Sequence, residues 1–170
     1  MNFKIADIDL NADTPECTTP TEIVSCVMSI CNKIFPNMQP DLTVFKKMND
    51  YQIAYSLSKV MYSQSFEEAN KATEVECKKI GLVTDTEEAL DKWSEIDSKY
   101  DSKYAVGKFM FLKWQAEKMM VEESFRIIEA DPKIKKQLSM NYTDYNMVKT
   151  NWEKPSIRQN VIDLAFKLKT

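Results

Sequence analysis

The chain has 170 residues, no histidine, only two glycines and a formal net charge of −3. Without histidine it lacks the commonest general base near neutral pH and the commonest metal ligand. Two glycines do not suffice for a phosphate-binding loop, which needs several close backbone approaches. Hydrophobic residues make up 44% of the chain, enough to bury a core. Scarce glycine also disfavours tight hairpins, so the composition favours helices.

Charge is divided unevenly along the chain. Residues 1–130 carry 15 basic and 22 acidic side chains, a net charge of −7, whereas residues 131–170 carry 8 basic and 4 acidic, a net charge of +4. A solvated basic tail is one explanation. Head-to-tail self-association is another, with the basic arm of one subunit on the acidic face of the next. The sequence leaves both open.

The cysteines and the N-terminus bear on location. Cys17, Cys26, Cys31 and Cys77 form no C-x-x-C pair. Helical spacing places Cys26 and Cys31 on an apolar stripe, which predicts buried, reduced thiols. The first ten residues lack the apolar segment of a signal peptide, and no run of 18 apolar residues is present. We therefore expect a virion or cytoplasmic protein that is neither secreted nor membrane-spanning.

The chain begins with an element that alternates apolar and polar residues. Residues 1–10 predict a short strand or arm, and the polar residues 11–18 predict a connection. A helix then starts at Thr19, which can cap it in a capping box with Glu22, and Pro20 suits the first helical position. Apolar residues at helical spacing continue to a stop at Pro36.

Two further helices follow in the middle of the chain. The first opens near Pro40, and Asn49 either breaks it or caps it again. Ser65, Phe66, Glu67 and Glu68 form a capping box that predicts a new, mostly polar helix. That helix ends at Gly81, which suits a C-cap.

Residues 84–88 cap the next helix, on which Leu90, Trp93, Ile96 and Tyr100 form one stripe. Residues 101–130 predict the longest helix of the chain, with an apolar face wide enough to pack on two sides. Asp131 and Pro132 then cap a short basic helix that runs to about Leu138.

The last quarter changes character. Residues 139–156 are aromatic, polar and without helical periodicity, which predicts an extended arm that docks on a partner. Residues 156–170 fit two alternatives. Ile157, Val161, Leu164 and Leu168 fit a helix, whereas Ile162, Leu164, Phe166 and Leu168 fit a strand that could pair with residues 3–10 of the same or another subunit.

The charged clusters have ordinary explanations. Glu67/Glu68 and Glu87/Glu88/Asp91 fall in first helical turns, where acidic groups complement the helix dipole. Glu122 and Glu123 can pair along their own helix. We therefore assign no catalytic residue, no metal ligand and no cofactor. Nucleic-acid binding is conceivable but not favoured, because basic residues interleave with the tail aromatics while the chain holds only two arginines. The basic residues concerned are Lys133, Lys135, Lys136, Lys149, Lys154 and Arg158.

In organisation, the chain resembles the ring-forming head–tail connector and adaptor proteins of tailed bacteriophages. The helices from 19 to 138, the aromatic arm 142–152 and the alternating segment 162–168 carry this resemblance. It implies a helical ring wall with terminal arms that reach neighbouring subunits or a portal, and it implies no catalytic residue.

Together these features predict a mainly α antiparallel bundle with an extended C-terminal arm, with or without short strands at the two termini. Its parts would be an N-terminal arm (1–18), a bundle (19–138) and a C-terminal arm (139–170). We expect a non-enzymatic structural protein that forms homo-oligomers and contacts other structural proteins. The alternatives are a small binding module, such as a virus-encoded inhibitor of a host protein, and an enzyme that uses carboxylates or lysine. The expected interface residues are Tyr142, Tyr145, Met147, Trp152, Ile157, Arg158, Ile162, Leu164 and Phe166.

Overall fold

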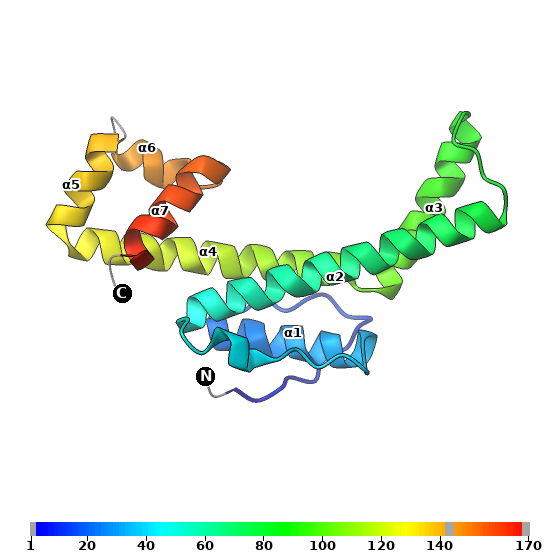
Figure 1. The fold of residues 1–170 in the computed structure, drawn as a ribbon, viewed down its shortest axis with the longest axis horizontal. Coiled ribbons are helices and arrows are strands. Elements are labelled where there is room, and N and C mark those ends of the chain that lie inside the picture. Colours follow the sequence, from blue (N-terminus) through cyan, green and yellow to red (C-terminus); the bar gives the residue numbers. More distant parts are fainter. Residues whose placement is uncertain (1–2, 142–144, 168–170) are drawn as a thin grey trace. The chain divides into compact units, whose positions relative to one another are not determined.

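The structure is a computed structural model that describes residues 3–141 and 145–167. These residues hold seven α-helices and a short 3-10 turn, so the mainly α fold is confirmed (Figure 1). The helices are α1 (Pro20–Ile34), α2 (Asp50–Lys79), α3 (Glu87–Lys103), α4 (Val106–Ala130), α5 (Pro132–Asn141), α6 (Tyr145–Thr150) and α7 (Pro155–Lys167), and the 3-10 turn η1 is Leu42–Phe45. The chain divides into two compact units, Met1–Ala116 and Glu117–Thr170. The three-part organisation expected from the sequence stays a prediction.

Helix α1 is the core of the first unit. Its N-cap is Thr19, whose side chain accepts a hydrogen bond from the Glu22 backbone, and Pro20 lies in its first turn, as predicted. The expected capping box is incomplete, because the Glu22 carboxylate accepts from the backbone N–H of Thr18, at 2.8 Å, instead of from that of Thr19. Every residue from Ile23 to Cys31 is buried, so neighbouring segments enclose this part of α1 on all sides.

Residues 3–18 form an irregular strap over α1. The sequence predicts a short strand or arm for residues 1–10, and their described part is an arm without a strand. The backbone N–H of Ala6 donates to Ser25 Oγ at 2.8 Å, and that of Ile8 donates to Ser29 Oγ at 3.0 Å. Both serines are buried on α1. Because helix side chains satisfy these backbone donors, the strap needs no partner strand. The segment that could have paired with it is helical.

Helix α2 is a single long helix. Asn49 and Gln52 form a reciprocal capping box at its start, so the chain is capped again at this point. The second capping box, expected at Ser65, is wrong, because α2 continues unbroken to Lys79. The buried Ser65 hydroxyl donates to the Tyr104 carbonyl at 2.5 Å and is therefore engaged away from its own backbone.

A turn at Gly81 joins α2 to α3, which runs back beside it as the second arm of a helical hairpin (Figure 1). Gly81 has φ 64°, and its N–H donates to the Lys78 carbonyl at 3.2 Å. The Leu82 N–H donates to the Cys77 carbonyl at 3.0 Å, which completes a Schellman motif. The predicted C-cap role of Gly81 is therefore confirmed. Thr86 caps the N-terminus of α3.

The predicted single helix 101–130 is interrupted. Helix α3 ends at Lys103, α4 begins at Val106, and Ala105 between them has φ 54°. The ring of Tyr104 stacks on Phe35 with centroids 6.1 Å apart, and its carbonyl accepts from Ser65. These tertiary contacts hold the break at a place where the sequence has no helix-breaking residue.

The second unit comprises the C-terminal half of α4 with α5, α6 and α7, and α5 packs against α7. The extended arm expected over residues 139–156 is wrong where the structure describes it, because residues 145–150 are helical. Of the two alternatives for residues 156–170, the helix is found, over residues 155–167. Pro155 takes the first position of α7, where its missing N–H is not needed. Val161 and Ala165, four residues apart, are both fully buried, whereas a strand would have buried Ile162 and Leu164 instead.

Candidate functional site

Most of the interface residues expected from the sequence lie on α6 and α7. Met147 is 61% exposed and Phe166 is buried. Tyr142 lies outside the described residues. Intermediate exposure is found for the rest, namely Tyr145, Trp152, Ile157, Arg158, Ile162 and Leu164. The segment therefore uses part of its apolar surface within the chain and leaves Met147 on the outside.

Tyr145 is held within the second unit. Its hydroxyl donates to Glu129 Oε1 at 2.9 Å, and Lys149 Nζ lies 2.9 Å from the same oxygen. Its ring meets Phe125 edge-on, and Lys135 Nζ lies 4.8 Å from its centroid. The hydrogen bond from Lys149 lowers the pKa of Glu129, and burial raises the pKa of Tyr145. The Glu129 carboxylate therefore binds two of the basic and aromatic side chains, Tyr145 and Lys149, that a nucleic-acid-binding surface would use.

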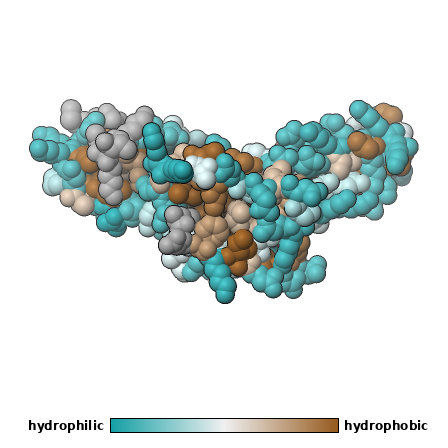
Figure 2. Space-filling model, turned by 60° about the horizontal axis from the view of Figure 1, so that its bottom comes forward, coloured by the Kyte–Doolittle hydropathy of each residue, from teal (hydrophilic) through white to brown (hydrophobic). Residues whose placement is uncertain are grey.

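A different surface, absent from the sequence-based expectations, lies on the outer half of the hairpin. We call residues 74–95, the end of α2, the Gly81 turn and the start of α3, the distal hairpin. Not one of them is buried. Its strongly exposed apolar side chains are Val75 (62%), Ile80 (53%), Val83 (66%), Leu90 (50%) and Trp93 (40%). Figure 2 shows apolar patches at this end of the hairpin, set among hydrophilic surface.

The distal hairpin is acidic. It carries seven acidic and three basic side chains, a net charge of −4. Near its inner end Glu76 Oε1 lies 2.6 Å from Lys99 Nζ and accepts a hydrogen bond from the Tyr100 hydroxyl, and the bond from Lys99 lowers the pKa of Glu76. A cavity of about 450 Å³ opens beside this group, with Ile80 and the buried Ile96 among its lining residues.

The sequence does contain a signal for this surface, because the apolar stripes on the end of α2 and on α3 consist of few residues. Apolar residues of α2 beyond Thr73 and of α3 recur at helical spacing, which indicates a core-facing side. The structure leaves that side mostly open: Ile96 is the buried residue of α3, and the buried residues of α2 end at Thr73. Two helices with so few apolar residues between them cannot enclose a core of their own.

The described parts of the chain contain neither a group of metal ligands nor a membrane-spanning helix. There, no three Cys, Asp or Glu side chains are grouped so that they could hold a metal ion. No helix within residues 3–141 and 145–167 combines the length and the apolar character needed to cross a bilayer. In comparisons with known proteins, no family model, no curated protein and no solved structure gives a significant match to this chain.

Proposed function

We propose that this protein is a non-enzymatic assembly protein whose copies associate head to tail. The distal hairpin of one copy would bind the basic second unit of the next. The observation that carries the proposal is the distal hairpin itself, which buries none of its residues and exposes five large apolar side chains. Isolated helices are marginal in water, and helices in proteins draw most of their stability from packing an amphipathic face. This hairpin therefore has a physical need for a partner.

The magnitudes are compatible with an interface. Covering a half-exposed large apolar side chain contributes roughly 1 kcal/mol, so the five together supply several kcal/mol. Association costs an estimated 4–15 kcal/mol in lost translational and rotational freedom, so apolar contact alone gives weak binding. Charge complementarity or a closed ring, in which each copy gains two interfaces, must add to it.

Charge favours a second copy as the partner. The distal hairpin has a net charge of −4, and residues 131–170 have a net charge of +4. The second unit also offers Met147, an exposed apolar side chain on α6 that could meet the apolar part of the hairpin. One chain thus carries both halves of a complementary pair, which supports self-association.

Head-to-tail contacts close into rings when the rotation between copies permits, and otherwise they continue as filaments. A ring is the form implied by the resemblance to head–tail connector proteins, so we propose a connector-type ring in a phage virion as the specific role. A monomeric binding module is the alternative, in which the distal hairpin would meet a different protein.

Size-exclusion chromatography with light scattering tests the proposal. The full chain should exceed its monomer mass at low salt and approach it as salt rises, because screening weakens charge complementarity. The double substitution Leu90→Ser and Trp93→Ser should lower the mass at every salt concentration. Val44→Ser, at an exposed apolar residue on η1, is the matched control and should leave the mass unchanged. A full chain that stays monomeric throughout would contradict self-association and favour the binding module.

A further inference from the structure

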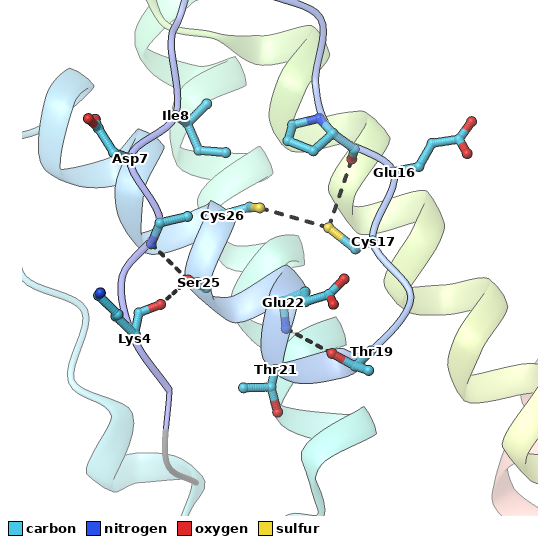
Figure 3. A pocket seen from close by; sticks show the side chains of 12 residues that line it. Lys4, Asp7, Ile8, Glu16, Cys17, Thr19, Thr21, Glu22, Ser25 and Cys26 are labelled. Carbon is cyan, nitrogen blue, oxygen red and sulfur yellow. Dashed lines mark hydrogen bonds between the residues drawn. The ribbon is translucent and has the colours of Figure 1, made fainter.

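The thiols of Cys17 and Cys26 face each other where the N-terminal strap meets α1. Their sulfur atoms are 3.8 Å apart, which is van der Waals contact (Figure 3). Cys17 belongs to the strap and is half-buried, whereas Cys26 belongs to α1 and is buried. All four cysteines of the chain are free thiols. Two thiols in contact, one of them partly accessible, constitute a distinct chemical site.

The protein holds this pair in place from both sides. The Cys17 backbone N–H donates to Gln115 Oε1 at 2.6 Å, and Gln115 Nε2 donates to the Pro15 carbonyl at 3.2 Å. Cys26 lies in the enclosed part of α1. Neither sulfur is positioned by a freely moving loop, so their contact is a property of the fold.

Reagents can reach the pair. Both cysteines line a cavity of about 440 Å³ between the two limbs of the strap and the start of α1. In Figure 3 the two sulfurs point toward each other across this space, with Glu22 nearby. A cavity of that size admits a small oxidant such as hydrogen peroxide.

The two sulfurs also share a proton in a way that suits thiol chemistry. The two thiols lie within hydrogen-bond distance, and either sulfur can donate. This contact lowers the pKa of Cys26 and raises the pKa of Cys17. Thiolate is the reactive form of cysteine, which favours Cys26 as the attacking sulfur and Cys17 as the resolving thiol. Burial, by contrast, raises the pKa of Cys31 and keeps it in the unreactive thiol form.

We propose that Cys17 and Cys26 form a peroxide-responsive redox site that closes into a reversible disulfide. The Cys26 thiolate, which has given its proton to solvent, attacks one oxygen of hydrogen peroxide, the O–O bond breaks, and the departing oxygen takes the Cys17 proton and leaves as water. The resulting Cys17 thiolate then attacks the sulfur of the Cys26 sulfenic acid, and the hydroxide that leaves takes up a proton from solvent to become the second water. The two thiols thus lose two electrons and two protons in total, and one peroxide becomes two waters. Low-molecular-weight thiols of the glutathione class reverse the reaction by exchange.

The disulfide would fasten the strap to α1 covalently. The strap is otherwise attached through hydrogen bonds such as those to Ser25 and Ser29. A cross-link between residues 17 and 26 restricts the unfolded chain and so stabilises the folded first unit. The site would make coverage of α1 depend on peroxide, and this inference does not rest on the proposed assembly.

Peroxide titration of the reduced full chain tests the site. Remaining thiols are labelled with a maleimide, and intact mass counts them. Digestion after Glu16 and Glu22 places Cys17 and Cys26 on separate peptides, so a link between them is visible without reduction. We expect two thiols to disappear together, a peptide cross-link from 17 to 26, recovery of both thiols with dithiothreitol, and a raised unfolding midpoint in the oxidised form.

Substitutions sharpen the assignment. Cys31→Ser leaves a single cysteine on the peptide that carries Cys26 and should preserve the cross-link. Cys77→Ser, at a half-buried cysteine on α2, is the matched control and should also preserve it. Cys17→Ser should abolish it. The proposal is overturned if Cys77 is consumed before the pair, if the cross-link involves Cys31, or if Cys17 or Cys26 oxidises singly to sulfinic acid.

Discussion

Arg158 on α7 pairs with Glu117 on α4, with Nε 2.5 Å from Oε1. Both side chains are largely buried, at 24% and 10% exposure. Arg158 is among the residues that the sequence predicts at an interface with other subunits, whereas its guanidinium meets a carboxylate within the second unit. An ion pair so shielded from water matters more to stability than an exposed one, because losing one partner leaves the other charge uncompensated.

Arg158→Ala should therefore destabilise the second unit by about 2 kcal/mol, most of it the penalty of leaving Glu117 unpaired. Urea unfolding measures the change. Lys154→Ala, an exposed position one turn earlier, is the control and should cost less than about 0.5 kcal/mol. Equal effects from the two substitutions would show that the pair contributes no more than any surface charge.

Ser29→Ala should loosen the N-terminal strap. It removes the acceptor of the Ile8 backbone N–H and leaves that buried donor unsatisfied, at a cost of about 1–2 kcal/mol. Hydrogen exchange should report faster exchange at Ile8. Ser98→Ala, on the exposed side of α3, removes the same hydroxyl group elsewhere and should leave Ile8 unchanged. Unaltered protection of Ile8 in the Ser29 variant would disprove the anchoring role of this serine.

The two glycines should respond in opposite directions to substitution by alanine. Gly81 has φ 64°, which a Cβ disfavours, so Gly81→Ala should destabilise the protein by about 1 kcal/mol. Gly107 lies in the first turn of α4 with open space around it, so Gly107→Ala should stabilise by up to about 0.5 kcal/mol. Thermal melts of the two variants compare them directly, and shifts in the same direction would refute this assignment.

Acid should weaken the contact between Glu129 and Lys149. The folded pKa of Glu129 lies below its usual value of 4.5, so its contribution is present above that pH and is lost as pH falls through the folded pKa. Glu129→Gln should therefore flatten the decline in unfolding free energy below about pH 4.5. Because the pair is exposed, the difference should not exceed about 0.5 kcal/mol. If the unfolding free energy of the variant declined in acid as steeply as that of the unmodified chain, Glu129 would contribute nothing to the acid sensitivity.

Local signals predicted several helices and the caps at Thr19 and Gly81 but failed at Ser65, and long-range contacts decided the rest. Adjacent residues suffice to predict the capping roles of Thr19, Pro20 and Gly81, because capping is a local interaction. The break at Ala105 depends on Ser65, which lies 39 residues from its partner Tyr104, and no local pattern announces it.

The candidate site, too, could be predicted only where local sequence signals suffice. The basic last quarter is visible in composition, but the helical form of its aromatic segment depends on contacts such as those of Tyr145 with Glu129 and Phe125. The exposed hairpin was hidden for the opposite reason. Leu90 and Trp93 have the spacing of core residues, and only the fold reveals that they stay 50% and 40% exposed.

Mixing two defective variants tests head-to-tail assembly most directly. One carries Leu90→Ser and Trp93→Ser on the distal hairpin, and the other carries Lys133→Glu and Lys136→Glu on the exposed side of α5. Each should sediment as a monomer. An equimolar mixture should form a dimer and nothing larger, because the intact hairpin of one variant meets the intact second unit of the other. A mixture that stays monomeric, or an α5 variant that assembles like the unmodified chain, would contradict the account.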